Sequence, residues 1–130
     1  MSTPTLPEAF REELVSAART VVGDELRSVT YFTEDDVEQV YLRGDLDPEA
    51  DLVGFADVER LGFHSRMDYR GTELGSYRFT IRVFDHGYLT RVIAGDHGVF
   101  VTTDPMVRDR FEELATALRE TLRGADVVTG

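Results

Sequence analysis

The stretch that decides the fold is residues 77–103, which reads YRFTIRVFDHGYLTRVIAGDHGVFVTT. Three runs rich in Val, Ile, Thr, Tyr and Phe are separated by short turns at 85–87 and 95–98. Such runs are typical of β-strands, and turns of this length join antiparallel neighbours. The stretch therefore predicts a three-stranded antiparallel meander, beginning with a strand from Tyr77 to Asp85.

The residues before the meander predict a helix followed by a further pair of strands. The helix is expected to start at a capping box formed by Thr5 and Glu8, and its apolar stripe ends at Gly23. Strands are expected at 26–33 and 37–43, because both segments are rich in β-branched and aromatic residues and a polar turn joins them. With the meander, these segments give five strands.

Two more helices are expected, one between the two groups of strands and one at the C-terminal end. Asp47 and the proline after it suit the first turn of the middle helix, which Gly62 weakens and could break. The final helix is expected to be capped by Asp104, or to restart at Asp109, and to end at Gly124. The residues of the middle helix expected to face a core are Leu52, Phe55, Ala56, Val58 and Leu61.

The order of elements is helix, two strands, helix, three strands, helix. This order predicts the α+β class, with a single five-stranded antiparallel sheet and three helices. Neighbouring apolar residues such as Val83 and Phe84 point to opposite faces of a strand, so both faces of the sheet need cover. We expect one domain over residues 1–124 and a flexible tail at 125–130.

Composition points to a salt-rich habitat. The chain has no lysine, and its 14 arginines face 25 acidic residues, which gives a net charge of −11. An acidic, lysine-free surface stays hydrated in near-molar salt, where the screening length falls to about 3 Å. A GC-rich genome would also favour arginine over lysine but does not explain the acidic excess. We therefore expect a protein of the haloarchaeal cytoplasm.

The same composition excludes several classes of protein. Cysteine is absent, so disulfides and thiolate chemistry are excluded. The chain has no apolar run of about 18 residues and no basic and apolar leader, so we expect neither a membrane span nor a secretory signal. The acidic charge disfavours nucleic acid as a partner.

Residues that could carry catalysis or hold a metal are present but poorly arranged. His86 and His97 lie at opposite ends of one expected strand, about 20 Å apart, and His64 has no acidic residue at ligand spacing. The alternating acids of 45–51 lack the glycine of a calcium loop and fit a helix start better. No nucleophile elbow, dinucleotide-binding motif or P-loop occurs. We therefore expect no enzyme, cofactor or metal.

Arginines and apolar residues near the third strand are the candidate binding residues. Arg78 and Arg82 are expected on one face of that strand, and Arg91 of the next strand could reach the same face. Their guanidinium groups could bind an anionic ligand or a partner's carboxylates, or pair with the chain's own acids. The third strand is expected at a sheet edge, which needs covering or pairing. The expected dimer-interface residues are Phe55, Leu61, Tyr77 and Phe79.

The order of elements resembles that of the roadblock, longin and profilin group of folds, whereas PAS and GAF sensors usually order their elements differently. The resemblance implies a homodimer joined through a helix and an edge strand, and a platform for small GTPases and motor or signalling complexes. In addition, TVVGDELRSVTYF at 20–32 and GDHGVFVTT at 95–103 are similar to a family of small haloarchaeal proteins of unknown function. That similarity implies a habitat and no activity.

The leading hypothesis is a non-enzymatic protein-interaction or regulatory module of a halophilic cytoplasm, whose partners are a second copy of itself and possibly another protein. One alternative is a PAS-like small-ligand sensor, which needs a cavity of about 300 Å³ or more beneath the middle helix. Another is a nucleic-acid-associated regulator, which needs an arginine-lined face of positive potential.

Overall fold

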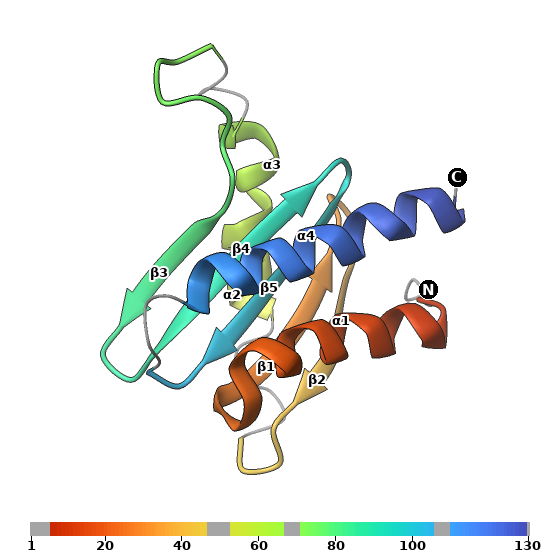
Figure 1. Ribbon diagram of the computed structural model, residues 1–130, viewed down its shortest axis with the longest axis vertical. Coiled ribbons are helices and arrows are strands. Elements are labelled where there is room, and N and C mark those ends of the chain that lie inside the picture. Colours follow the sequence, from red (N-terminus) through yellow and green to blue (C-terminus); the bar gives the residue numbers. More distant parts are fainter. Residues whose placement is uncertain (1–5, 47–52, 67–70, 106–109, 130) are drawn as a thin grey trace.

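One antiparallel sheet of five strands forms the centre of the molecule (Figure 1). The computed structural model describes residues 6–46, 53–66, 71–105 and 110–129. The strands stand in the order β2-β1-β5-β4-β3, and every neighbouring pair is antiparallel. Their bounds are β1 Leu26–Phe32, β2 Val37–Leu42, β3 Thr80–Phe84, β4 Gly87–Ala94 and β5 His97–Thr103. The predicted fold class and order of elements are therefore confirmed.

Helices cover both faces of the sheet (Figure 1). Helices α1 (Glu8–Val22) and α4 (Arg110–Thr129) lie side by side on one face. Helices α2 (Val53–Arg60) and α3 (Gly62–Ser65) lie on the other, and a short 3-10 helix, η1 (Gly23–Glu25), leads into β1. The middle helix expected from the sequence is thus broken into two pieces.

Each face of the sheet has its own apolar core. The larger core joins α1 and α4 to the sheet through residues such as Leu14, Leu118 and Val101. The smaller core lies under α2 and α3 and is mainly aromatic. Its buried members are Phe32, Ala56, Phe63, Leu89, Ile93 and Phe100. The sheet therefore lies between two layers of helices, as expected for strands that are apolar on both faces.

The third strand lies at an edge of the sheet, as predicted, but it is shorter than expected. It begins at Thr80, which pairs with Arg91 of β4, and not at Tyr77. The Tyr77 hydroxyl is hydrogen-bonded to the hydroxyl of Thr80, three residues later. Before Thr80 the chain leaves the sheet. Residues 71–77, called the arm below, project from the body of the molecule (Figure 1).

Helix ends differ from the sequence-based prediction at three places. Helix α1 begins at Glu8, with Pro7 as its N-cap. Leu6 precedes a proline and therefore avoids the helical conformation, so the helix does not start there. Thr5 of the expected capping box lies outside the described residues. Asp104 is a bend residue whose carboxylate binds Arg43 and does not cap α4. Helix α4 continues past Gly124 to Thr129. The other expected caps, at Asp47 and Asp109, also lie outside the described residues.

Candidate interaction surface

A buried carboxylate fixes the position of α2 on the sheet. Glu59 is 1% exposed and turns inward. Its Oε1 accepts a hydrogen bond of 3.0 Å from Arg91 Nη1, and its Oε2 accepts one of 2.6 Å from Arg82 Nε. Charge-assisted bonds of this kind are short and strong, particularly where water is excluded. The two arginines of β3 and β4 therefore hold α2 through one acid.

Arg91 is the centre of this network. It is only 5% exposed, and its Nη2 donates to the Tyr77 hydroxyl at 2.9 Å and to Thr80 Oγ1 at 2.7 Å. Gly62 lies directly against the guanidinium group, because a Cβ at this position would come within 2.4 Å of its carbon. The glycine that weakens the middle helix thus leaves room for Arg91.

Arg78 does not belong to the same network, contrary to the sequence-based prediction. It precedes β3, and its Nη1 lies 2.8 Å from Glu112 Oε2 of α4, on the opposite face of the sheet from α2. Arg82 and Arg91 do share a face, because Thr80 and Arg82 of β3 pair with Arg91 and Leu89 of β4. All three arginines pair with the chain's own acids, which is one of the two arrangements considered from the sequence.

Large apolar side chains are exposed along α2, the arm and β3. Leu61 is 67% exposed, Val83 is 72% exposed and Leu74 is 92% exposed. With Val58 and Phe84 these residues form what we call the α2–β3 surface. A hollow of about 470 Å³ between α2, α3 and the arm includes Val58, Leu61 and Leu74 in its lining. Phe84 faces the same side of the sheet as α2, whereas Val83 pairs with Tyr88 and faces the side of α1 and α4, so the set surrounds the free edge of β3 from both sides. Exposed apolar side chains around a free strand edge are typical of a protein interface.

The four residues predicted for a dimer interface occupy different environments. Leu61 is exposed in the turn between α2 and α3, and Phe55 is half-buried with its ring stacked 6.5 Å from that of Phe84. Tyr77 is half-buried and bonded to Arg91, while Phe79 packs against the core of α1 and α4. The geometry therefore leaves Leu61 and the Phe55–Phe84 pair available to a partner, with Tyr77 and Phe79 turned mostly inward.

The space beneath α2 is filled by side chains. Phe32 packs against Phe63 and Phe100, with ring centroids 5.4 and 5.9 Å apart, and Phe55 contacts Phe100 from α2 at 6.4 Å. A hollow of about 200 Å³ at the margin of this layer, lined partly by Phe55 and Thr102, is smaller than the cavity a PAS-like sensor needs. The hollow of about 470 Å³ exceeds that size, but it lies between α2, α3 and the arm and not beneath α2, and its Arg82 and Arg91 are bonded to Glu59. The structure gives that alternative no support.

The histidines lie apart, and two of them have protein partners. His97 begins β5 and contacts the Tyr31 hydroxyl through Nδ1, so it is not a freely solvated turn residue. His64 Nε2 lies 3.5 Å from Glu34 Oε1, an acid that sequence spacing did not suggest. His86 is exposed at the β3–β4 turn. Among the residues that the structure describes, no three His, Asp or Glu side chains gather in a way that could hold a metal.

Two charged residues with structural roles were missed in the sequence. Glu59 was not recognised because its neighbours Val58 and Leu61 were expected to face the core, whereas Ala56, Glu59 and Phe63 do so. Arg43 donates to Asp104 Oδ2 at 2.6 Å and to Asp45 Oδ1 at 2.7 Å, tying the end of β2 to the end of β5. The carboxyl pKa of both acids is held below its ordinary value, chiefly by these bonds.

Solved structures with this architecture define the fold as that of roadblock/LC7 domains. An MglB with a tetrameric arrangement has a TM-score of 0.61 and 14% identity, and the match covers 96% of this chain and 99% of that one. Myxococcus xanthus MglB has a TM-score of 0.60 and 12% identity over 92% and 94% of the two chains. A roadblock/LC7 domain from Streptomyces avermitilis has a TM-score of 0.55 and 16% identity over 93% and 98%.

The family of the chain is also defined. Residues 12–123 match the family described as Domain of unknown function (DUF7522), and the chain belongs to it. A search of curated proteins gave no match. None of the helices described is both long and apolar enough to cross a membrane.

Proposed function

We propose that this protein is a non-enzymatic interaction module that forms a homodimer through the α2–β3 surface and presents the dimer to a further protein partner. The observation that carries the proposal is an unpaired edge strand, β3, bordered by exposed apolar side chains on α2 and the arm. A tetrameric arrangement in a roadblock-fold neighbour is consistent with self-association.

The two edges of the sheet are not equivalent, and this difference favours β3 as the pairing edge. Every residue of β2 is only partly exposed, and its Glu38 is ion-paired with Arg11 of α1. Strand β2 therefore has little exposed apolar surface that a partner would need to cover. Strand β3 instead presents Val83 and Phe84, both well exposed, at its end. A second β3 placed alongside would satisfy the free backbone groups and cover these side chains.

Arg82 is the one member of the predicted arginine set that fits a role at this interface. Its side chain remains 41% exposed although its Nε binds Glu59. Its remaining N–H groups can donate to a carboxylate of the partner subunit, whereas Arg91 is enclosed and Arg78 faces α4. We assign Arg91 to positioning α2, which holds the interface in place.

Single-cysteine variants test this dimer directly, because the natural chain contains no cysteine. In an antiparallel pair around a two-fold axis, equivalent residues near the axis have Cα atoms about 4.5–5.5 Å apart, which a disulfide can bridge. We expect mild oxidation to cross-link one or more of Ile81→Cys, Val83→Cys and Phe84→Cys into dimers. The β2 variant Gln39→Cys is the control and is expected to stay uncross-linked.

A charge placed at Leu61, between α2 and α3, gives an independent test. Leu61→Asp puts a carboxylate into the expected contact and should shift the solution mass from two chains to one. The control, Ser16→Asp, adds the same charge at an exposed position of α1, on the other face of the sheet, and should leave the dimer intact. The proposed interface is wrong if Leu61→Asp leaves the mass unchanged, or if only the β2 cysteine cross-links.

The acidic composition supports placing this module in a salt-rich, haloarchaeal type of cytoplasm. Repulsion among 25 acidic residues is muted at near-molar salt, and carboxylates keep the surface hydrated there. The salt dependence of stability, described in the Discussion, tests this part of the proposal.

A further inference from the structure

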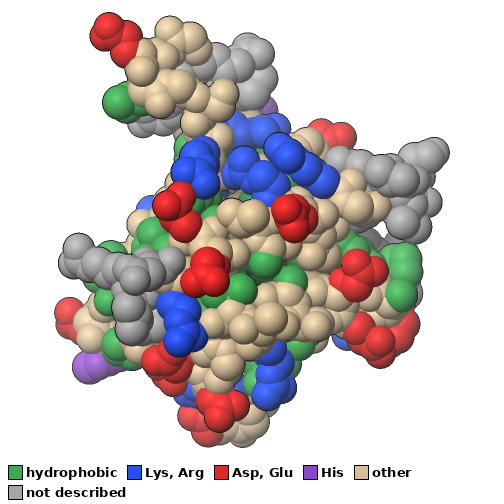
Figure 2. Space-filling model, viewed as in Figure 1, with side chains coloured by type: hydrophobic (Ala, Val, Ile, Leu, Met, Phe, Trp, Pro, Cys, Tyr) green, Lys and Arg blue, Asp and Glu red, His purple; other side chains and the backbone are tan. Residues whose placement is uncertain are grey.

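An arginine-lined hollow lies between the arm and α4. It borders the hollow of the α2–β3 surface and shares with it Arg66, Thr72, Gly75, Ser76 and Tyr77. Its volume is about 790 Å³, and Arg66, Arg119 and Arg123 supply its charged lining. Figure 2 shows arginine side chains gathered at the base of the arm, in a chain whose net charge is −11. None of the lining residues belongs to α2 or β3.

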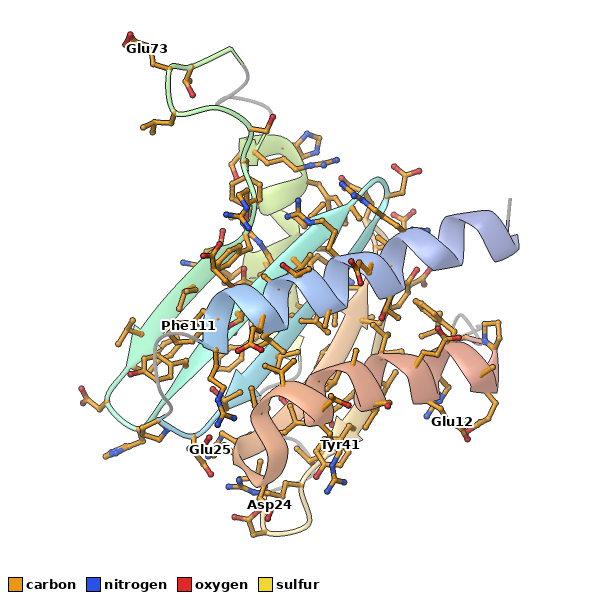
Figure 3. All side chains as sticks on the ribbon, in the orientation of Figure 1. Glu12, Asp24, Glu25, Tyr41, Glu73 and Phe111 are labelled. Atoms are coloured by element: carbon orange, nitrogen blue, oxygen red, sulfur yellow. The ribbon has the colours of Figure 1, made fainter. Side chains whose placement is uncertain are left out.

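The arginines of this hollow are not neutralised by the described part of the chain. No ion pair joins Arg66, Arg119 or Arg123 to an acid whose side chain is described. Burial and the neighbouring charges of Arg123 and Arg78 lower the pKa of Arg119 below its ordinary value, and Tyr77 acts in the opposite direction. Glu73 lies at the tip of the arm and points away from the body (Figure 3). The protein therefore keeps a group of mutually repelling cations together despite its excess of acids.

Arg66 forms part of one wall of the hollow. It follows α3 and donates through Nη2 to the carbonyl of Gly95 at 3.0 Å, which fixes the guanidinium at the β4–β5 turn. Its charge is therefore held in place at the hollow before any ligand binds.

The geometry of α4 selects the spacing of the ligand's charges. Arg119 and Arg123 are four residues apart on one helix, so their Cβ atoms lie about 5–6 Å apart on the same face. Alternate residues of an extended peptide lie about 6.6 Å apart on one side of the chain. Two carboxylates separated by one residue would therefore face these two guanidinium groups together. The nearly buried Ile93 and Ala94 offer an apolar floor beside them.

We infer that this hollow binds an extended acidic segment of a partner protein, with Asp or Glu at alternate positions, through Arg66, Arg119 and Arg123. A short acidic segment places its charges inside the hollow. A long nucleic acid would extend its phosphates over the acidic remainder of the surface, where repulsion opposes binding. The inference rests on the proposed interaction role but not on the homodimer.

Fluorescence anisotropy with a labelled peptide, Glu-Ser-Glu-Ser-Glu-Ser-Glu, tests the inference at about 0.1 M KCl. The full-length protein should bind this peptide at least fivefold more tightly than a peptide of the same composition with its four glutamates contiguous. Arg119→Gln with Arg123→Gln should weaken binding at least tenfold, and Arg119→Lys with Arg123→Lys should weaken it less, because charge is kept while bidentate bonding is lost.

A matched control separates the hollow from the general loss of positive charge. Arg19→Gln with Arg110→Gln also removes two arginines from helices, and it should change peptide affinity less than twofold. Equal weakening by the two double variants overturns the inference, and so does tighter binding of inorganic pyrophosphate or a ten-nucleotide single strand. Retention of the wild-type solution mass by Arg119→Gln with Arg123→Gln keeps this test independent of the homodimer.

Discussion

Glu59→Gln is the substitution that most directly tests how α2 is held on the sheet. Glutamine keeps the volume of the side chain but removes the carboxylate that faces both Arg91 and Arg82. Hydrogen bonds to charged groups are worth about 1.5–3 kcal/mol each. Arg91 is almost fully buried, so its bond counts nearly in full, whereas the bond from Arg82 is discounted because that side chain is partly exposed.

The expected loss is therefore about 3–4 kcal/mol, which agrees with the cost of breaking a buried ion pair from one side. Urea unfolding at fixed protein and salt concentrations measures it, because urea leaves the ionic strength unchanged. With a slope near 2 kcal/mol per molar urea, the midpoint should fall by about 1.5–2 M.

Two further variants show whether the buried charge is the cause. Glu34→Gln removes an exposed acid of the β1–β2 turn and should change stability by less than about 0.5 kcal/mol. Glu59→Leu combined with Arg91→Met removes both buried charges and should be less damaging than Glu59→Gln alone. A loss below about 1 kcal/mol for Glu59→Gln would refute this account of how α2 is anchored.

Three other predictions concern close packing, pH and salt. Gly62→Ala should destabilise the protein by about 1–3 kcal/mol, measured by urea unfolding, because its Cβ would meet the Arg91 guanidinium. Gly124→Ala in α4 has open space around its Cβ and should stabilise the protein by about 0.5–1 kcal/mol. The hydrogen bond from Arg43 holds the carboxyl pKa of Asp104 in the folded protein below its ordinary value of 3.8. The ionised Asp104 therefore stabilises the fold above about pH 4, and this stabilisation is lost as the pH falls through the pKa of the folded state. Unfolding curves should therefore weaken below about pH 4, and Asp104→Asn should flatten that decline. The melting temperature should rise between about 0.1 and 3 M KCl, and an unchanged value would remove the physical basis for a salt-rich habitat.

The order of elements was predictable because the sequence marks each element locally. The turns at 85–87 and 95–98 separate runs of strand-forming residues, and these turns join β3, β4 and β5 in the structure. The pairing of β1 with β5 is long-range, and no local signal in the sequence indicates it. The cap at Asp104 failed because the acid is used by Arg43 from another strand.

The candidate surface was only partly predictable. Periodicity placed the apolar residues of α2 but not the rotation of the helix, because a buried ion pair places Glu59 inside and leaves Leu61 outside. The arginine hollow was missed, since Arg66 lies far in sequence from α4 and meets it only through the fold. The spacing of Arg119 and Arg123, four residues apart on a predicted helix, was the one signal available.

The solution mass of the chain, measured by light scattering in about 2 M KCl, tests the central claim most directly. A self-associating module should give twice the 14.7 kDa of one chain, and Leu61→Asp should return it to the mass of a single chain. A wild-type mass of one chain over the micromolar range would contradict the proposed dimer and leave the exposed residues of α2 and β3 without their explanation.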